Sequence, residues 1–172
     1  GDVEAALISD NSTLGFTALD GLCMGTRPGA LDPGVVLYLF QALGLSVKEV
    51  ETILYKKSGL IGISGISNDM RSLLASNEPA AGLALDYFVY RAAKEIAAMT
   101  AALGGIDGLV FTAGIGENSP EIRKRICVAS AWLGVELDED ANARKAPRIT
   151  SQASKVPAWV IPTNEELMIA RH

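Results

Sequence analysis

The residues best suited to bind a ligand form a glycine-rich turn at 113–118, between an apolar run at 109–112 and a predicted helix that begins at Ser119-Pro120. The turn reads Ala113, Gly114, Ile115, Gly116, Glu117 and Asn118. Glycines let a ligand approach the main chain, and the free N–H groups at a helix start attract anions. The pattern predicts an anion or nucleotide site, and an ordinary strand-to-helix turn is the open alternative.

Two familiar nucleotide motifs match this turn only in part. Gly114, Gly116 and Ser119 imitate a dinucleotide-binding fingerprint, and Glu136 follows about 20 residues further on. However, Ser119 stands where close helix packing favours Gly or Ala, and no convincing strand precedes Glu136. A Walker A loop would need a Lys-Ser or Lys-Thr pair after the glycines, and none follows. The turn therefore fits neither motif.

Two further loops carry charges that suit a phosphorylated ligand. Arg27 lies among small residues, and its planar guanidinium matches phosphate oxygens; a surface arginine paired with Asp32 is the alternative. Asp69 and Arg71 begin a short predicted helix. Asp69 would accept from a ribose hydroxyl and Arg71 would lie against a base or a phosphate, or the pair is a helix cap with a surface arginine.

Glu165 follows a predicted strand at 156–161 and lies at the start of a predicted terminal helix. A carboxylate at that position suits the helix dipole, and capping alone explains it. The carboxyl end of a strand is also where Mg²⁺ carried by nucleotide phosphates would be held, usually through water. Both interpretations stay open on the residues alone.

The elements that must position these groups alternate between strands and helices, which indicates an α/β fold. Predicted strands lie at 3–8, 109–112 and 156–161; predicted helices at 34–44, 47–57, 69–76, 79–103 and 119–133 and from 163 onward; and long loops at 16–33 and 58–67. Ser46 and Glu49 form a capping box that starts the second helix. No internal repeat or interdomain linker is visible, so a single domain is expected.

The composition narrows the functional class. Of 172 residues, 49% are hydrophobic and the net charge is −5, which favours a globular domain and argues against nucleic-acid binding. His172 is the only histidine, so a histidine-based metal site or triad is not expected. No apolar run reaches the roughly 18–20 residues of a membrane span. Two widely separated cysteines, Cys23 and Cys127, are expected to be buried, reduced thiols, as in a cytosolic protein.

Taken together, the chemistry-bearing segments resemble one family. They are residues 14–22, 24–29, 32–33, 57–65, 67–71, 111–119 and 161–171, and they look like the signature of the acetate kinases. They occur in the family's order and spacing and cover nearly the whole chain from Leu14 onward. This ordered set is far more specific than any single glycine motif.

The resemblance implies an acetate and sugar kinase/Hsp70/actin-type fold. In this α/β fold two ribonuclease H-like domains, each a mixed sheet flanked by helices, enclose the active site. Residues 1–172 would be the nucleotide-binding C-terminal half, the N-terminal domain being absent. The reaction implied is ATP + acetate ⇌ ADP + acetyl phosphate, in the cytoplasm, by a homodimer formed through this domain.

The resemblance also implies roles for particular residues. Arg27 would stabilise the transferring phosphoryl group, and Asp69, Met70 and Arg71 would line the adenosine pocket. Gly114, Ile115, Gly116, Glu117 and Asn118 would hold ATP or ADP on their main chain, and Glu165 would help to bind Mg²⁺.

The chain departs from the family pattern at its start. In the family, the N-terminal domain supplies a catalytic aspartate, a histidine near the phosphoryl group, an arginine for the acetate carboxylate and a magnesium-binding asparagine. The match begins after those segments, so the chain is expected to be inactive alone. A propionate or butyrate kinase, and a non-catalytic nucleotide-binding or dimerisation module, remain as alternatives; the stretch 65–69 favours acetate.

Overall fold

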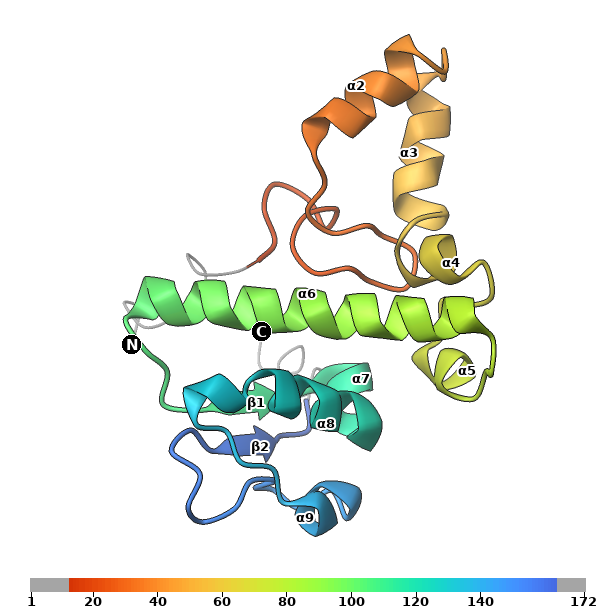
Figure 1. Ribbon diagram of the computed structural model, residues 1–172. Coiled ribbons are helices and arrows are strands. Elements are labelled where there is room, and N and C mark those ends of the chain that lie inside the picture. Colours follow the sequence, from red (N-terminus) through yellow and green to blue (C-terminus); the bar gives the residue numbers. More distant parts are fainter. Residues whose placement is uncertain (1–12, 164–172) are drawn as a thin grey trace, which may run out of the picture. The chain divides into compact units, whose positions relative to one another are not determined.

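The computed structural model describes residues 13–163 (Figure 1). The chain falls into two compact units, residues 1–102 and residues 103–172. Each unit is described by itself. The predicted strand at 3–8, the terminal helix and Glu165 lie outside the described residues. The prediction of a single domain over 1–172 stays a prediction. In the described part of the chain, no helix is both long enough and apolar enough to span a membrane.

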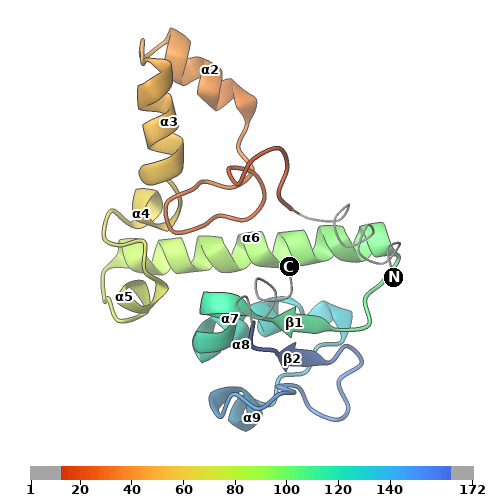
Figure 2. The ribbon, with the colours of Figure 1, turned by 180° about the vertical axis from the view of Figure 1, so that it is seen from behind.

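The first unit is helical. After a loop at 13–32, as predicted, come α2 (Pro33–Gln41), α3 (Val47–Lys56), α4 (Gly59–Ser64), α5 (Met70–Leu74) and α6 (Pro79–Leu103), which runs to the unit boundary (Figures 1 and 2). The apolar core of this unit includes Leu60 and Leu73, both fully buried, and Cys23. Along α6 the buried residues are small or aliphatic: Ala81, Ala84, Leu85 and Ala92.

The capping box predicted before α3 is present. The Ser46 hydroxyl accepts from the Glu49 N–H at 3.3 Å, and the Glu49 carboxylate accepts from the Ser46 N–H at 2.7 Å. The N–H groups of Ser46 and Glu49, at the start of α3, are thereby satisfied without tertiary contacts. The start of this helix can therefore be predicted from the sequence.

The prediction of a loop at 58–67 is wrong for residues 59–64, which form α4. No side chain caps this helix. The N–H groups of Leu60 and Ile61 instead donate to the carbonyls of Met24 and Gly25, at 2.9 and 3.0 Å. Main-chain carbonyls from a distant loop thus replace a side-chain cap at the start of α4. The high content of glycine and serine in this segment did not indicate a helix.

The second unit contains a parallel strand pair. β1 (Leu109–Phe111) pairs with β2 (Ala158–Val160), with Leu109 opposite Ala158 and Phe111 opposite Val160. Two isolated antiparallel bridges, Leu137 to Thr150 and Arg148 to Trp159, add the mixed character expected of the sheet. The pair packs on a core formed by Cys127, Val135, Ile149, Val156, Ala158 and Val160.

Helices follow and flank these strands. They are α7 (Ala113–Asn118), α8 (Pro120–Ala129), the 3₁₀ turn η1 (Ala131–Leu133) and α9 (Glu139–Ala143). The helix predicted at 119–133 is therefore divided at Ser130, whose N–H bonds to both Ile126 and Cys127 carbonyls as the last turn tightens. Ser119 caps α8 as predicted, accepting from the Ile122 N–H at 3.4 Å.

Candidate functional site

The loop that carries Arg27 is fixed by its main chain in the first unit. The Met24 N–H donates to the Arg27 carbonyl at 3.0 Å and closes a tight turn. The three carbonyls inside that turn accept from the start of α4: Met24 from Leu60 (2.9 Å), Gly25 from Ile61 (3.0 Å) and Thr26 from Ser58 (3.1 Å). The main chain of the turn is therefore fixed by four hydrogen bonds.

The Arg27 side chain is half-buried and is not paired with Asp32. Asp32 instead caps α2, accepting from the Gly34 N–H at 2.8 Å. Arg27 borders a hollow of about 690 Å³ whose other charged residues are Lys48, Glu51 and Lys56. Cations outnumber anions three to one in this lining, which suits an anionic ligand.

The structure brings the Arg27 loop against the second predicted segment. A Cβ built at Gly25 would lie 2.9 Å from the Asn68 carbonyl oxygen, closer than real Cβ contacts come. Glycine is therefore needed for this close approach. Gly25 and Asn68 are 43 positions apart, yet the segment with Arg27 and the segment that continues into Asp69 and Arg71 lie side by side in one unit.

Asp69 performs the capping role that was the open alternative. Its carboxylate accepts from the Arg71 N–H at 2.9 Å and from the Arg71 guanidinium, with Nη2 to Oδ2 at 2.8 Å. These hydrogen bonds, the side-chain one first, hold the pKa of Asp69 below its usual value. Arg71 is 87% exposed and extends into solvent, whereas Met70 is only 5% exposed and belongs to the core. Of the three residues, Arg71 is therefore the most accessible from solvent and Met70 the least.

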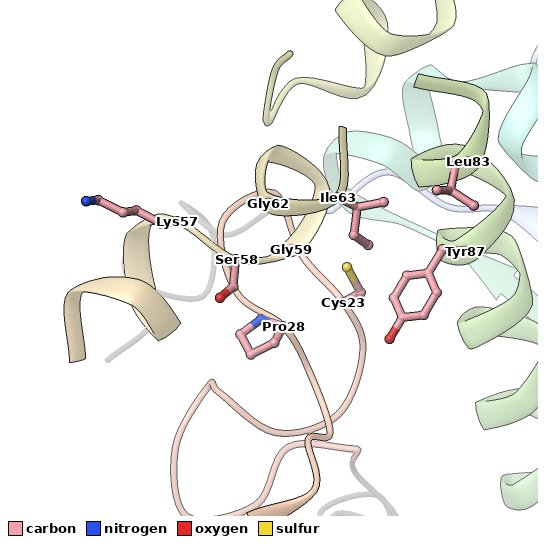
Figure 3. Close-up of a pocket in the computed structure, with 9 residues that line it drawn as sticks. All are labelled: Cys23, Pro28, Lys57, Ser58, Gly59, Gly62, Ile63, Leu83 and Tyr87. Carbon is pink, nitrogen blue, oxygen red and sulfur yellow. The ribbon is translucent and has the colours of Figure 1, made fainter. Parts of the chain in front are cut away.

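An apolar hollow of about 500 Å³ is lined in part by Pro28, the residue that follows Arg27 (Figure 3). Figure 3 shows Cys23 facing Ile63 and Tyr87, with Pro28 on the wall and Lys57 extending away. Burial raises the pKa of the Cys23 thiol. With an apolar wall and a neutral thiol, this hollow offers little to a phosphate group.

In the second unit, the predicted glycine turn forms the short helix α7, and its glycines differ in environment. A Cβ at Gly114 would meet nothing within 4 Å, so the main chain there faces open space. A Cβ at Gly116 would lie 3.2 Å from the carbonyl carbon of Phe111, so this glycine permits packing against β1. Ala113 has φ 57°, the left-handed region that non-glycine residues rarely adopt. Such strain often marks a binding turn.

The polar side chains of α7 are engaged within the unit. The Glu117 carboxylate accepts from the Thr163 N–H at 2.9 Å and from the Thr163 hydroxyl at 3.0 Å, and these bonds lower the pKa of Glu117. Asn118 donates to the Gly114 carbonyl at 3.0 Å and accepts from Lys145 Nζ at 3.0 Å. What remains for a ligand is the exposed main chain at Gly114.

One residue of this region escaped the sequence analysis. Arg123 on α8 is 0% exposed and donates to carbonyls of α7 and to Asn142. In the sequence Arg123 is one of three consecutive basic residues of α8 and does not stand out, because its partners are 6 to 19 residues away. The described residues hold no group of three His, Cys, Asp or Glu side chains that would bind a metal.

Known proteins resemble this chain along almost all of its length. The sequence model of the acetokinase family matches residues 7–171. An acetate kinase of Rhodopseudomonas palustris strain TIE-1 is 61% identical over 163 residues, covering 94% of this chain and 41% of the relative. An acetate kinase of Rickettsia akari is 53% identical, covering 95% of this chain and 42% of the relative. The chain thus spans about two fifths of the length of these relatives.

Solved structures agree with the sequences. The crystal structure of Porphyromonas gingivalis acetate kinase matches with a TM-score of 0.86 and 39% identity, covering 92% of this chain and 41% of that one. A propionate kinase from Francisella tularensis matches with a TM-score of 0.87 and 44% identity, covering 92% and 42%. The predicted fold class is confirmed by these neighbours.

Proposed function

Because this chain belongs to the acetokinase family, we propose that it is the nucleotide-binding part of an acetate kinase. The observation that carries the proposal is identity of 50–61% with acetate kinases over nearly the whole chain. In the reaction, an acetate oxygen attacks the γ-phosphorus of ATP, the bond to the β-phosphate oxygen breaks, and ADP leaves. Phosphoryl transfer of this kind depends on positioning and charge neutralisation.

Arg27 is the residue we assign to the transferring phosphoryl group. Its loop is held by three main-chain hydrogen bonds from the start of α4, and its guanidinium borders a cationic hollow. A planar cation carried on a main chain fixed in this way would stabilise charge on the equatorial phosphoryl oxygens.

Each unit carries residues that we assign to the nucleotide by the family pattern, and each set is considered within its own unit. In the first unit, Asp69, Met70 and Arg71 would line the adenosine pocket, Arg71 being the exposed member. In the second unit, the main chain of 114–118 would approach the nucleotide, and the open space at Gly114 supports this role. The strained Ala113 is a further sign of a turn shaped for a ligand.

Mg²⁺ would accompany the nucleotide. Protein sites for nucleotide-bound Mg²⁺ need only one or two carboxylates, because phosphates and waters complete the shell. Glu165 is the carboxylate we assign, two residues after Thr163, the partner of Glu117. Bound there, Mg²⁺ would neutralise phosphate charge.

Hydroxamate formation tests the proposal. The complete polypeptide that carries this chain is incubated with ATP, Mg²⁺, acetate and hydroxylamine, and the 172 residues are assayed in parallel. We expect acetyl hydroxamate from the complete polypeptide only, because the groups for acetate lie in the other domain by resemblance. No product from the complete polypeptide contradicts the function, and a full rate from the 172 residues contradicts their incompleteness.

A propionate kinase is the second candidate, favoured by the Francisella tularensis neighbour at 44% identity. Comparing kcat/KM for acetate, propionate and butyrate separates the two. We expect the highest kcat/KM for acetate. A higher kcat/KM for propionate would instead assign the chain to a propionate kinase.

A homodimer through this part of the chain is also proposed, in the cytoplasm. None of the nine residues of α2 is buried, although the helix is almost entirely apolar; Leu37 and Tyr38 are 54% and 57% exposed. Such a helix is best explained by a second copy that covers it. Leu37→Glu should convert the dimer to a monomer in analytical ultracentrifugation, and a dimer that persists argues for another surface. Two buried, unpaired thiols fit a reducing compartment.

A further inference from the structure

The most deeply buried charge in the described chain lies directly beneath the predicted nucleotide turn. Arg123 is the largest fully buried side chain, at 0% exposure. Its Nη1 donates to the carbonyls of Gly116 and Glu117 at 2.9 and 3.0 Å. Nε donates to Asn142 Oδ1 at 2.8 Å, and Nη2 to the Asn142 carbonyl at 2.9 Å. All three guanidinium nitrogens are therefore engaged.

The partners of Arg123 are neutral oxygens, and no carboxylate contacts it among residues 13–163. Burying a cation without an opposite charge is costly unless its donors are satisfied. Two of the acceptors are carbonyls in the last turn of α7, where the helix dipole places partial negative charge. Arg123 therefore acts as a C-terminal cap for α7 supplied from the neighbouring helix.

The other side-chain hydrogen bonds of the turn, made by Glu117 with Thr163 and by Asn118 with Gly114 and Lys145, are exposed to solvent. α7 has only six residues, none of them buried, and Thr112 at its start makes no side-chain cap. It begins at the strained Ala113. Asn142 keeps the guanidinium in place and also donates from Nδ2 to the Pro120 carbonyl at 2.9 Å, at the start of α8. One buried arginine and one buried asparagine thus connect α7, α8 and α9.

We propose that Arg123 is a positioning residue for the nucleotide: by capping the carbonyls of Gly116 and Glu117 it fixes the main chain of the turn in its binding conformation. Asn142 is a second positioning residue, because it orients the guanidinium of Arg123. The inference rests on the proposed nucleotide role of 114–118. It assigns to these two residues no contact with the substrate.

The test uses three variants of the complete polypeptide: Arg123→Lys, Asn142→Ser and, as a control, Arg144→Ala at an exposed arginine of the same unit. A lysine keeps the charge but has no planar fork, so it would not reach both carbonyls and Asn142 together. ADP affinity is measured by calorimetry, KM for acetate by the hydroxamate assay and folding by Tm.

We expect about a hundredfold weaker ADP binding in Arg123→Lys and about tenfold in Asn142→Ser, with KM for acetate unchanged, because misplacement by an ångström has effects of this order. Arg144→Ala should bind ADP normally. Wild-type affinity in a folded Arg123→Lys or Asn142→Ser protein overturns the inference, as does an equal rise in KM for acetate. If Arg123→Lys does not fold, Asn142→Ser decides. Failure of the wild type to bind ADP would instead overturn the proposed function.

Discussion

Replacing Gly114 with alanine should stabilise the fold and weaken nucleotide binding in the same protein. The backbone at Gly114 does not have a positive φ, and an added Cβ would meet nothing within 4 Å. Alanine is favoured over glycine inside a helix by roughly 0.5–1 kcal/mol, and no steric cost opposes it here. For a chain of this size that corresponds to a rise in Tm of roughly 1–4 °C.

The binding effect has the opposite sign. If the nucleotide approaches the main chain at Gly114, the new methyl group occupies part of that open space. A loss of about tenfold in ADP affinity, or about 1.4 kcal/mol, is expected. Calorimetric titration with ADP and thermal unfolding would be measured on the same preparation. Because the fold is stabilised, weaker binding would not be a consequence of unfolding.

Gly116→Ala is the matched control. Its Cβ would lie 3.2 Å from the carbonyl carbon and 3.4 Å from the Cα of Phe111, so β1 must shift by a few tenths of an ångström. Overpacking of this kind costs about 1 kcal/mol or more, and Tm should fall. Wild-type ADP affinity in Gly114→Ala would refute main-chain approach at this glycine, and a lowered Tm in Gly114→Ala would refute the open-space argument.

Three further outcomes follow from the described contacts. Arg27→Ala in the complete polypeptide should lower kcat by roughly 10²–10³ with little change in ADP affinity, since a transition-state cation is lost; near-normal turnover contradicts the role. Glu117→Gln should lower Tm at neutral pH. Because bonds from Thr163 depress the pKa of Glu117 below 4.5, this stability exists above that pH and disappears as pH falls through the lowered value; a pH-independent difference contradicts it. Cys23 and Cys127 are each 1% exposed, and burial raises the pKa of Cys127 to about 11, so neither thiol should react with Ellman's reagent at pH 8 until the protein is denatured.

Local chemistry explains what the sequence predicted well. The capping box at Ser46 and the ends of α6 at Pro79 and Leu103 depend on residues within a few positions, so they are readable from spacing. The α4 helix depends on carbonyls of residues 24–26, more than 30 positions away, and was therefore missed. Tertiary acceptors, like side-chain caps, satisfy helix starts, but they have no local signature.

The candidate site divides in the same way. Arg27 and the turn at 114–118 could be proposed from the sequence, because their residue types and family pattern mark them. Arg123 and Asn142 were missed because a buried polar pair is recognised only by its partners. The capping of α5 by Asp69 shows the converse, since a residue chosen for a ligand role also serves an ordinary structural one.

The attachment of the Arg27 turn to α4 has a consequence for evolution and engineering. All three anchoring hydrogen bonds join main-chain atoms, so they persist whichever side chains occupy positions 24, 26 and 58. Side chains at positions 24, 26 and 58 can therefore change during evolution or engineering without moving the main chain at Arg27. A proline at 58, 60 or 61 would abolish one of the donors, and a side chain at Gly59 would collide with the Met24 carbonyl oxygen, because glycine at this position has φ 65° and its Cβ would have no room. The loop that carries Arg27 is thus tolerant of side-chain changes at 24, 26 and 58, and sensitive to proline at the donors and to any larger residue at Gly25 and Gly59.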